Sequence, residues 1–219
     1  MIGGLGIAAG AGYLLGSLPF GYLVARARGV DIFKAGSGNP GATNVRRVLG
    51  SKAGNLVFAL DALKGALASS WSLLSYTGLQ LALPGSDGSA VVAGQDWRML
   101  GLAGLIGAVL GHSCSVFTRF KGGKGVATTA GGMFVLLPVS CLIGGAVWLV
   151  VFYATRYVSL GSILAALAVA TACWLRGNPL PLKLVVSALC LFIVVRHREN
   201  ISRLLRGTEN KFVRKPPPA

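Results

Sequence analysis

Residues 124–156 read KGVATTAGGMFVLLPVSCLIGGAVWLVVFYATR, a long apolar run that indicates the fold class. Between its terminal basic residues, Lys124 and Arg156, lie 31 residues without a charged side chain. One helix crosses the hydrocarbon core of a bilayer with about 20 apolar residues, so this run is too long for a single crossing. Pro138 interrupts the run, and both of its ends are basic, which is typical of the cytoplasmic side. We therefore predict two short membrane helices that turn near Pro138.

The rest of the chain repeats this alternation of apolar runs and basic loops. The other apolar runs cover residues 2–25, 55–76, 99–117, 160–175 and 182–195. Together they predict an all-α integral membrane protein of about seven transmembrane helices, some of them short. With the N-terminus outside and the C-terminus in the cytoplasm, 17 of the 21 Lys and Arg residues lie on the cytoplasmic side. Arg176 and Lys183, in the loop after the sixth helix, depart from the rule.

Composition excludes a soluble domain. The chain is 53% hydrophobic and only 12% charged, and its mean hydropathy is +0.68. The net charge of +15 does not indicate nucleic acid, because the basic residues alternate with apolar runs and so suit anionic headgroups or substrates. The N-terminus lacks a charged segment before its apolar run, so we expect a retained helix rather than a signal peptide. Residues 1–210 are predicted to form one polytopic domain, and residues 211–219 a basic, proline-rich cytoplasmic tail.

Cysteine and histidine usage gives no metal site. The four cysteines show no CxxC spacing and lie in or beside apolar runs, so we expect small packed hydrophobic side chains: Cys114, Cys141, Cys173 and Cys190. The two histidines, His112 and His197, are far apart in the sequence, which does not favour zinc. We predict neither a metal nor another cofactor.

A glycine-rich stretch, GSGNPGATN at 36–44, lies in the basic loop 26–52. Glycine reaches positive φ and has no side chain, so such a loop can aim consecutive backbone N–H groups at an oxyanion. Hydroxyl and amide donors come from Ser37, Asn39, Thr43 and Asn44. We interpret this loop as an anion site, although a glycine-rich loop can also be a simple turn.

A second glycine-rich element, KGGKG at 121–125, carries two lysines and leads into the helix expected from about Val126. The N-terminus of a helix adds a favourable field for an anion. The Walker A spacing is absent, so ATP binding is not indicated. The sequence alone thus predicts two phosphate-sized anions bound on one membrane face.

Three features have structural alternatives that the residues leave open. Basic residues beside a membrane can be topological markers only. Asp61 and Lys64, at i and i+3, can be a helix-stabilising pair or part of a site, because charges inside a membrane are costly and often functional. His112, at a helix end, can simply bind a backbone carbonyl.

Three motif regions resemble a known family. They are GSGNPGATNV at 36–45, GHSCSVFTRFKGGKGVAT at 111–128, and RYVSLGSI at 156–163 with RHRENISRLLRGTE at 196–209. Supporting segments are GSLPFGYL at 16–23 and DALKGALA at 61–68. In this order they are similar to the bacterial acyl-phosphate:glycerol-3-phosphate acyltransferases of the PlsY type.

The resemblance implies a seven-helix enzyme of the bacterial inner membrane whose active face is cytoplasmic. It would transfer a fatty acyl group from acyl phosphate to the sn-1 hydroxyl of glycerol 3-phosphate, giving lysophosphatidic acid and phosphate for phospholipid synthesis. Its partners would be the two substrates and bilayer lipid, with no nucleic acid and no obligate protein partner. From the residues alone, without the resemblance, a membrane transporter of a phosphorylated small molecule is the alternative.

The resemblance also assigns site residues. The acyl phosphate would be bound by Ser37, Gly38, Asn39, Gly41, Ala42, Thr43 and Asn44. Glycerol 3-phosphate would be bound by Arg47, Lys124, Ser162, His197 and Asn200, and the catalytic residues among them would be Arg47, Lys124, His197 and Asn200. Arg47 is preferred over Arg46, because the family places its arginine two residues after the end of the NV pair, Asn44-Val45. Arginine can engage two phosphate oxygens at once.

The general base is not evident from the sequence. Soluble-headed glycerolipid acyltransferases carry Asp five residues after a His, but here Phe117 follows His112 and Ser202 follows His197 at that offset. We therefore expect substrate assistance, in which the phosphate of the acceptor, with a second pKa near 6, deprotonates the attacking hydroxyl. His197 is the alternative base, because imidazole ordinarily titrates near neutral pH.

Overall fold

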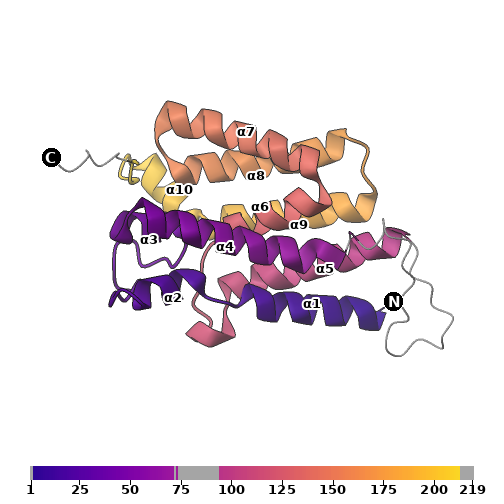
Figure 1. The fold of residues 1–219 in the computed structure, drawn as a ribbon. Coiled ribbons are helices and arrows are strands. Elements are labelled where there is room, and N and C mark those ends of the chain that lie inside the picture. The colour runs from indigo at the N-terminus through magenta and orange to yellow at the C-terminus, as the bar shows by residue number, and fades with distance from the viewer. Residues whose placement is uncertain (1, 72, 74–93, 213–219) are drawn as a thin grey trace. The chain divides into compact units, whose positions relative to one another are not determined.

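The computed structural model describes residues 2–71, 73 and 94–212, and all regular secondary structure in this part of the chain is helical (Figure 1). It divides into two compact units, residues 1–138 and 139–219, and each is described by itself. Residues 72 and 74–93, which include the end of the predicted apolar run 55–76 and most of the stretch before the run at 99–117, lie outside the described residues, as do residues 213–219 of the predicted tail.

Unit 1, residues 1–138, contains the first six α-helices. They are α1 (Ile2–Gly16), α2 (Phe20–Arg26), α3 (Ala42–Leu49), α4 (Ser51–Ser69), α5 (Gly94–Ser113) and α6 (Val126–Leu136), with a 3₁₀ turn at Val116–Thr118. The first predicted apolar run, 2–25, is thus two helices. Pro19 precedes α2 and offers no backbone N–H, which favours a break at this position.

Small residues let the helices of unit 1 approach closely. Helix α1 lies along α5, and α4 packs against α1, α5 and α6. A side chain at Gly107 of α5 would collide with the Ala9 carbonyl of α1, and one at Gly65 of α4 with the Thr128 carbonyl of α6. Close contact of helix backbones through glycine is typical of membrane proteins, where apolar burial alone does not drive helices together.

The prediction of a loop over residues 26–52 is wrong in part, because this stretch contains helix α3 and the start of α4. Residues Ala42–Leu49 form an eight-residue helix, and α4 begins at Ser51, four residues before the predicted Asn55. Sequence analysis missed α3 because a short helix with Arg46 and Arg47 on it carries no apolar run of spanning length. Its buried Val45 packs in a cluster with Ala25, Ile32, Ala53 and Val57, so the segment is anchored to α2 and α4.

Unit 2 begins where the long apolar run breaks. Helix α6 ends at Leu136 and α7 (Pro138–Thr155) begins at Pro138, so the predicted break is confirmed. The prediction of two short helices holds for α6, with 11 residues, but not for α7, with 18. The remaining helices are α8 (Val158–Leu175), α9 (Leu180–Arg196) and α10 (Arg198–Leu205). At 18 and 17 residues, α8 and α9 are about 26 Å long, close to a full crossing rather than short.

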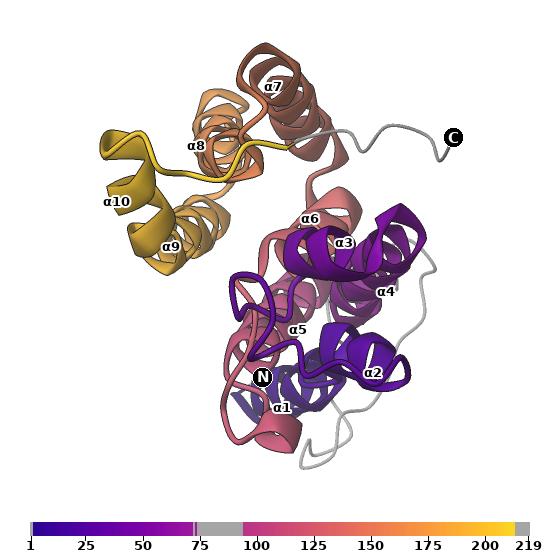
Figure 2. The same ribbon diagram turned by 90° about the vertical axis from the view of Figure 1, so that its left-hand side faces the viewer.

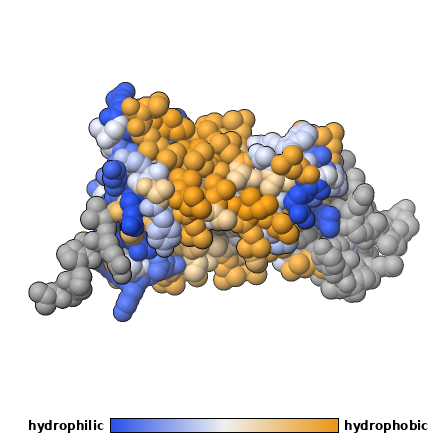
Figure 3. Space-filling view, turned by 90° about the horizontal axis from the view of Figure 1, so that it is seen from above, coloured by the Kyte–Doolittle hydropathy of each residue, from blue (hydrophilic) through white to orange (hydrophobic). Residues whose placement is uncertain are grey.

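Among the described residues, four helical segments are long and apolar enough to cross a membrane. They are Gly3–Arg26, Trp97–Thr118, Pro138–Thr155 and Val158–Leu175. Helices α9 and α10, bent by 56° at His197, make a fifth if the pair counts as one span. Large apolar side chains such as Leu142 and Val150 of α7 are exposed, and Figure 3 shows apolar residues gathered across the middle of the visible face. This surface suits lipid and not water.

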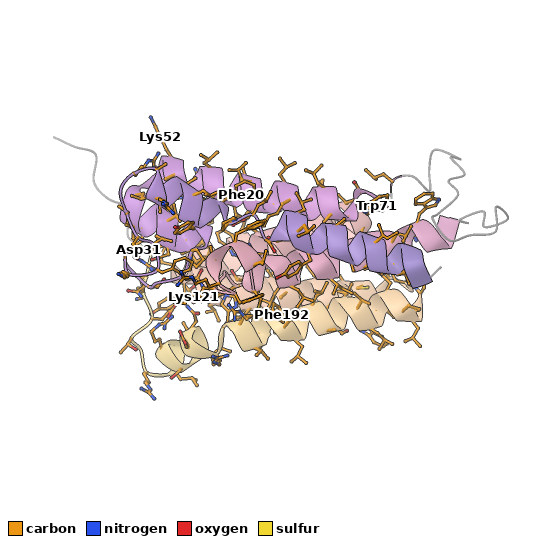
Figure 4. The ribbon with its side chains drawn as sticks, turned by 90° about the horizontal axis from the view of Figure 1, so that it is seen from below. Phe20, Asp31, Lys52, Trp71, Lys121 and Phe192 are labelled. Atoms are coloured by element: carbon orange, nitrogen blue, oxygen red, sulfur yellow. The ribbon has the colours of Figure 1, made fainter. Side chains whose placement is uncertain are left out.

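The loops that carry the predicted phosphate ligands of unit 1 lie at one end of it. Lys52 and Trp71 mark the opposite ends of α4 (Figure 4). Phe33 and Pro40, from the loop before α3, line one cavity together with Lys121, Gly122 and Gly123. The two glycine-rich segments therefore meet at the end of unit 1 where α4 begins.

Candidate functional site

The predicted site residues fall in both units. The glycine-rich loop, Arg47 and Lys124 belong to unit 1, whereas Ser162, His197 and Asn200 belong to unit 2. Within each unit the structure shows what holds these side chains in place.

The loop at 36–44 is closed by its own asparagines. Asn44 is buried; its Oδ1 accepts a hydrogen bond from the Ser37 N–H (2.8 Å) and its Nδ2 donates to the Ala35 carbonyl (2.9 Å). Asn39 Oδ1 accepts from the Gly41 N–H (2.8 Å). Gly36 and Gly38 have φ of 59° and 69°, a conformation that favours glycine.

These bonds change the interpretation of the loop. The N–H groups of Ser37, Gly38 and Gly41 already donate within the protein, so they do not form the expected row of N–H groups aimed at an anion. Asn39 and Asn44 shape the loop. The hydroxyl-bearing residues Ser37 and Thr43 are exposed.

The two arginines of α3 differ in their surroundings. Arg46 Nη1 donates to Asn55 Oδ1 of α4 (3.2 Å), and Gly54 of α4 packs against the Arg46 side chain. Arg47 is exposed, and its Nη1 lies 3.4 Å from Asn44 Oδ1. Arg46 thus fastens α3 to α4, whereas the exposed guanidinium of Arg47 is available to a ligand.

The KGGKG loop packs closely against the C-terminal end of α5. The Gly123 N–H donates to the His112 carbonyl (3.0 Å), and a Cβ at Gly123 would collide with the His112 ring. Gly125, with φ of 82°, precedes the first residue of α6. Lys124 therefore lies between two glycines whose conformations are set by α5 and α6.

A buried charged cluster supports this loop. Lys64 Nζ lies 2.8 Å from Asp61 Oδ1 and donates to the Leu18 carbonyl (3.0 Å), and His112 Nδ1 lies 3.5 Å from the same Asp61 oxygen. The Asp61 and Lys64 side chains are 3% and 2% exposed. The pair predicted from the i, i+3 spacing is therefore real, and His112 contacts a carboxylate through its ring.

The cluster lines a small, partly open cavity in unit 1. Its other walls come from the break between α1 and α2, from Phe20 at the start of α2 and from Lys121; Figure 4 labels the last two. Sequence analysis missed the contact of Asp61 with His112 because the two residues lie on different apolar runs, and nothing in either run indicates the pairing.

In unit 2 the two predicted ligands Ser162 and His197 are buried. Ser162 Oγ donates to the Val158 carbonyl (2.8 Å), and Trp148 Nε1 lies 3.4 Å from it. His197, at the bend between α9 and α10, has Nδ1 2.8 Å from the Ile193 carbonyl. A carbonyl only accepts, so Nδ1 is the donor of this hydrogen bond.

Asn200, on α10, is held by an acidic residue that sequence analysis did not assign. Its Nδ2 donates to Glu209 Oε1 (2.7 Å), which also accepts from Ser159 Oγ (2.8 Å), while Arg203 Nε donates to Glu209 Oε2 (2.7 Å). Burial raises the pKa of Glu209, but the hydrogen bonds from Asn200, Ser159 and Arg203 outweigh it and hold that pKa below its ordinary value. The signal available in the sequence was that Glu209, one of only six acidic residues, closes the third motif region.

The described residues hold no group of three or more His, Cys, Asp and Glu side chains suited to a metal ion. All four cysteines are free. Cys173 and Cys190 are buried and Cys141 is half-buried, as expected for packed side chains, but Cys114 is exposed.

Known proteins resemble this chain over nearly its whole length. The profile of a family described as glycerol-3-phosphate acyltransferase matches residues 6–207. The chain belongs to the glycerol-3-phosphate acyltransferase family. A glycerol-3-phosphate acyltransferase of Aquifex aeolicus is 42% identical over 200 residues, which are 91% of this chain and 95% of that protein. One from a Nostoc species is 44% identical over 209 residues, covering 93% and 89% of the two chains.

Solved structures agree with this assignment. A crystal structure of PlsY, an integral membrane glycerol 3-phosphate acyltransferase in its glycerol 3-phosphate form, has a TM-score of 0.83 at 40% identity and covers 95% of this chain and 96% of its own. A second structure of PlsY, in the lysophosphatidic acid form, has a TM-score of 0.81. The resemblance seen in the motifs is therefore confirmed, and the chain is an acyltransferase of the multi-pass membrane type.

Proposed function

We propose that this protein transfers a fatty acyl group from acyl phosphate to the sn-1 hydroxyl of glycerol 3-phosphate, releasing lysophosphatidic acid and inorganic phosphate. The observation that carries this is the family match over residues 6–207, which covers the first two motif regions and all but the last two residues of the third. The solved relatives were captured with glycerol 3-phosphate and with lysophosphatidic acid, an acceptor and a product of this reaction. The donor and the sn-1 position rest on the motif resemblance.

The proposed topology has seven spans in one functional domain, residues 1–210. Helix α4, with Asp61 and Lys64 inside it, and the 11-residue α6 complete the set formed by α1–α2, α5, α7, α8 and α9. The excess of basic residues in the loops that follow α2, α5 and α7 supports a cytoplasmic active face and an outside N-terminus. The proposed location in the bacterial inner membrane rests on the motif resemblance.

Two sets of ligands serve the two substrates. The exposed Ser37 and Thr43 bind the acyl phosphate, on a loop shaped by Gly38, Asn39, Gly41, Ala42 and Asn44. Glycerol 3-phosphate is bound by Arg47, Lys124, Ser162, His197 and Asn200. Cationic donors give charge-assisted hydrogen bonds to phosphate, which are about twice as strong as neutral ones.

The chemistry needs positioning more than acid or base strength. The sn-1 oxygen forms a bond to the acyl carbonyl carbon, the bond from that carbon to the bridging oxygen of phosphate breaks, and the hydroxyl proton goes to the acceptor's own phosphate. Phosphate is already a good leaving group, so Arg47 and Lys124 act by orienting the acceptor and by stabilising charge.

The two roles considered for His197 exclude one another at a given moment. Since Nδ1 carries its hydrogen toward Ile193, a histidine that donates to phosphate through Nε2 is an imidazolium, which cannot accept the hydroxyl proton. A neutral His197 can accept that proton but cannot donate to phosphate. We propose the binding role, with the acceptor's phosphate as the base. In the His197→Gln variant we expect a raised KM for glycerol 3-phosphate with substantial kcat retained; loss of kcat alone would assign the base to His197.

The reaction is tested by phosphate release from the detergent-purified protein given palmitoyl phosphate, with and without glycerol 3-phosphate. We expect release that depends on the acceptor, together with formation of lysophosphatidic acid. Turnover only with acyl-CoA would overturn the proposed donor. If folded protein shows no turnover at all, uptake of glycerol 3-phosphate into proteoliposomes tests the transporter alternative.

A further inference from the structure

Glu209 is the buried carboxylate of unit 2, and the reaction above gives it no role. It follows α10 by four residues, in the segment 206–212 that returns from α10 toward α8 and α7 (Figure 2). The Phe212 N–H donates to the Arg156 carbonyl (2.8 Å), and the Phe212 ring packs edge-on against Phe152 of α7. This segment is therefore fastened at both ends, with the Glu209 side chain only 6% exposed between them.

Glu209 joins two helices that each carry a proposed ligand of glycerol 3-phosphate. One oxygen, Oε1, accepts from Asn200 Nδ2 of α10 (2.7 Å) and from Ser159 Oγ of α8 (2.8 Å). Ser159 lies one turn before Ser162 on α8. The other oxygen, Oε2, accepts from Arg203 Nε (2.7 Å).

The bond to Asn200 fixes the orientation of its amide. An ionised carboxylate only accepts hydrogen bonds, so the NH₂ group of Asn200 must face Glu209 and its carbonyl oxygen must face away. A bond to a charged acceptor is stronger than a neutral one, so the flipped amide is disfavoured. The same carboxylate sets the distance between α10 and the N-terminal turn of α8.

We propose that Glu209 is a positioning residue for acyl transfer: it holds Asn200 in the one amide orientation that binds glycerol 3-phosphate and ties α10 to the Ser162 end of α8. The inference rests on the proposed function, because it takes Asn200 as a ligand of the acceptor. It adds a role for a carboxylate that itself contacts neither substrate.

The structural alternative is that Glu209 only clamps the segment 206–212 through its ion pair with Arg203. In that case its removal would lower the stability of unit 2 whatever residue stands at 200. A double-mutant cycle separates the two roles, because residues that act through one another have non-additive effects.

The test uses full-length protein and four variants: Glu209→Gln, Asn200→Ala, the double variant, and Glu199→Gln as the matched control. Glu199 is an exposed glutamate on the first turn of α10. We expect Glu209→Gln to raise the KM for glycerol 3-phosphate about tenfold, as loss of a hydrogen bond to a charged group predicts. In the Asn200→Ala background the same substitution should change KM less than about twofold. Glu199→Gln should match the wild type.

An equal loss in both backgrounds would overturn the positioning role, as would an unchanged KM in Glu209→Gln. If Glu209→Gln fails to fold, Glu209→Asp keeps the charge on a shorter side chain, and its smaller rise in KM should also vanish in the Asn200→Ala background. Failure of the proposed function is a separate result, since wild-type protein would then release no phosphate on addition of the acceptor. If the wild type is active but Asn200→Ala has a normal KM, Asn200 is not a ligand and the inference fails alone.

Discussion

Asp61 in unit 1 and Glu209 in unit 2 are both nearly buried carboxylates, and each supports a segment that carries a proposed phosphate ligand. Asp61 lies within α4, where its partners are Lys64 and the His112 ring. Glu209 lies in an irregular segment, where two of its three donors are the neutral side chains of Ser159 and Asn200.

Because of this difference, we expect one carboxylate to act mainly on the stability of the protein and the other mainly on the orientation of a ligand side chain. Removing Asp61 would leave the buried ammonium of Lys64 without its counter-charge, which is costly in a helix bundle. Removing the charge of Glu209 would leave the half-buried Arg203, whose side chain is 34% exposed and can be solvated. We therefore expect Asp61 to matter most for folding and Glu209 most for the position of Asn200.

The largest expected effect is on the stability of unit 1. Asp61→Asn should destabilise the protein by about 3–5 kcal/mol, because Lys64 becomes an uncompensated buried charge. Thermal unfolding in detergent should show this as a fall in Tm of roughly 10 °C. Asp31→Asn, which removes an exposed carboxylate 3.8 Å from Lys34, is the matched control and should leave Tm nearly unchanged.

The pair can also be removed as a whole. Asp61→Leu combined with Lys64→Met should recover most of the lost stability, because well-packed apolar residues often replace a buried ion pair without loss. If the double variant is as unstable as Asp61→Asn, the contact of Asp61 with His112 contributes more to stability than its pairing with Lys64. Asp61 would then differ from Glu209 through its histidine partner and not through its ion pair.

A smaller effect is expected on activity when the KGGKG loop is displaced. Gly123→Ala places a methyl group against the His112 ring and should shift Lys124, lowering kcat/KM by up to about 10²-fold while the fold persists. Gly145→Ala on α7, where an added Cβ meets no atom within 4 Å, is the control. Normal kinetics for Gly123→Ala would show that the loop tolerates a shift and that the cluster beneath it serves stability alone.

The smallest effect is the pH dependence contributed by Glu209. Its pKa in the folded protein lies below the ordinary value near 4.5, so its contribution to stability is present above that value and is lost as the pH falls through the folded pKa. Between pH 6 and pH 4, Glu209→Gln should lose less stability than the wild type, by under about 1 kcal/mol. An identical slope in Glu209→Gln and in the wild type would contradict the assignment.

The sequence predicts those parts of the molecule that depend on local pattern. The apolar runs gave the helices, and Pro138 gave the break between α6 and α7. The motifs gave the family and the ligand-bearing segments. Helices α3 and α10 were not predicted, because each is only eight residues long, carries basic side chains and has no apolar run of spanning length.

Contacts between distant segments could not be predicted in this way. The ring of His112 meets Asp61 only because α4 and α5 pack together, and Glu209 reaches Ser159 only because the chain returns after α10. The free N–H groups expected in the glycine-rich loop are used by Ala35, Asn39 and Asn44, and such internal hydrogen bonds depend on the folded path of the loop.

The different exposure of the cysteines allows local opening of the helices to be followed by the reactivity of their thiols. Cys114, in unit 1, is exposed and should react with an alkylating reagent at once, whereas Cys173 and Cys190 are buried in α8 and α9 and should react only when that helix pair separates. The slow phase of thiol labelling therefore measures how often the helices that carry Ser162 and His197 come apart, and no cysteine has to be introduced by mutation.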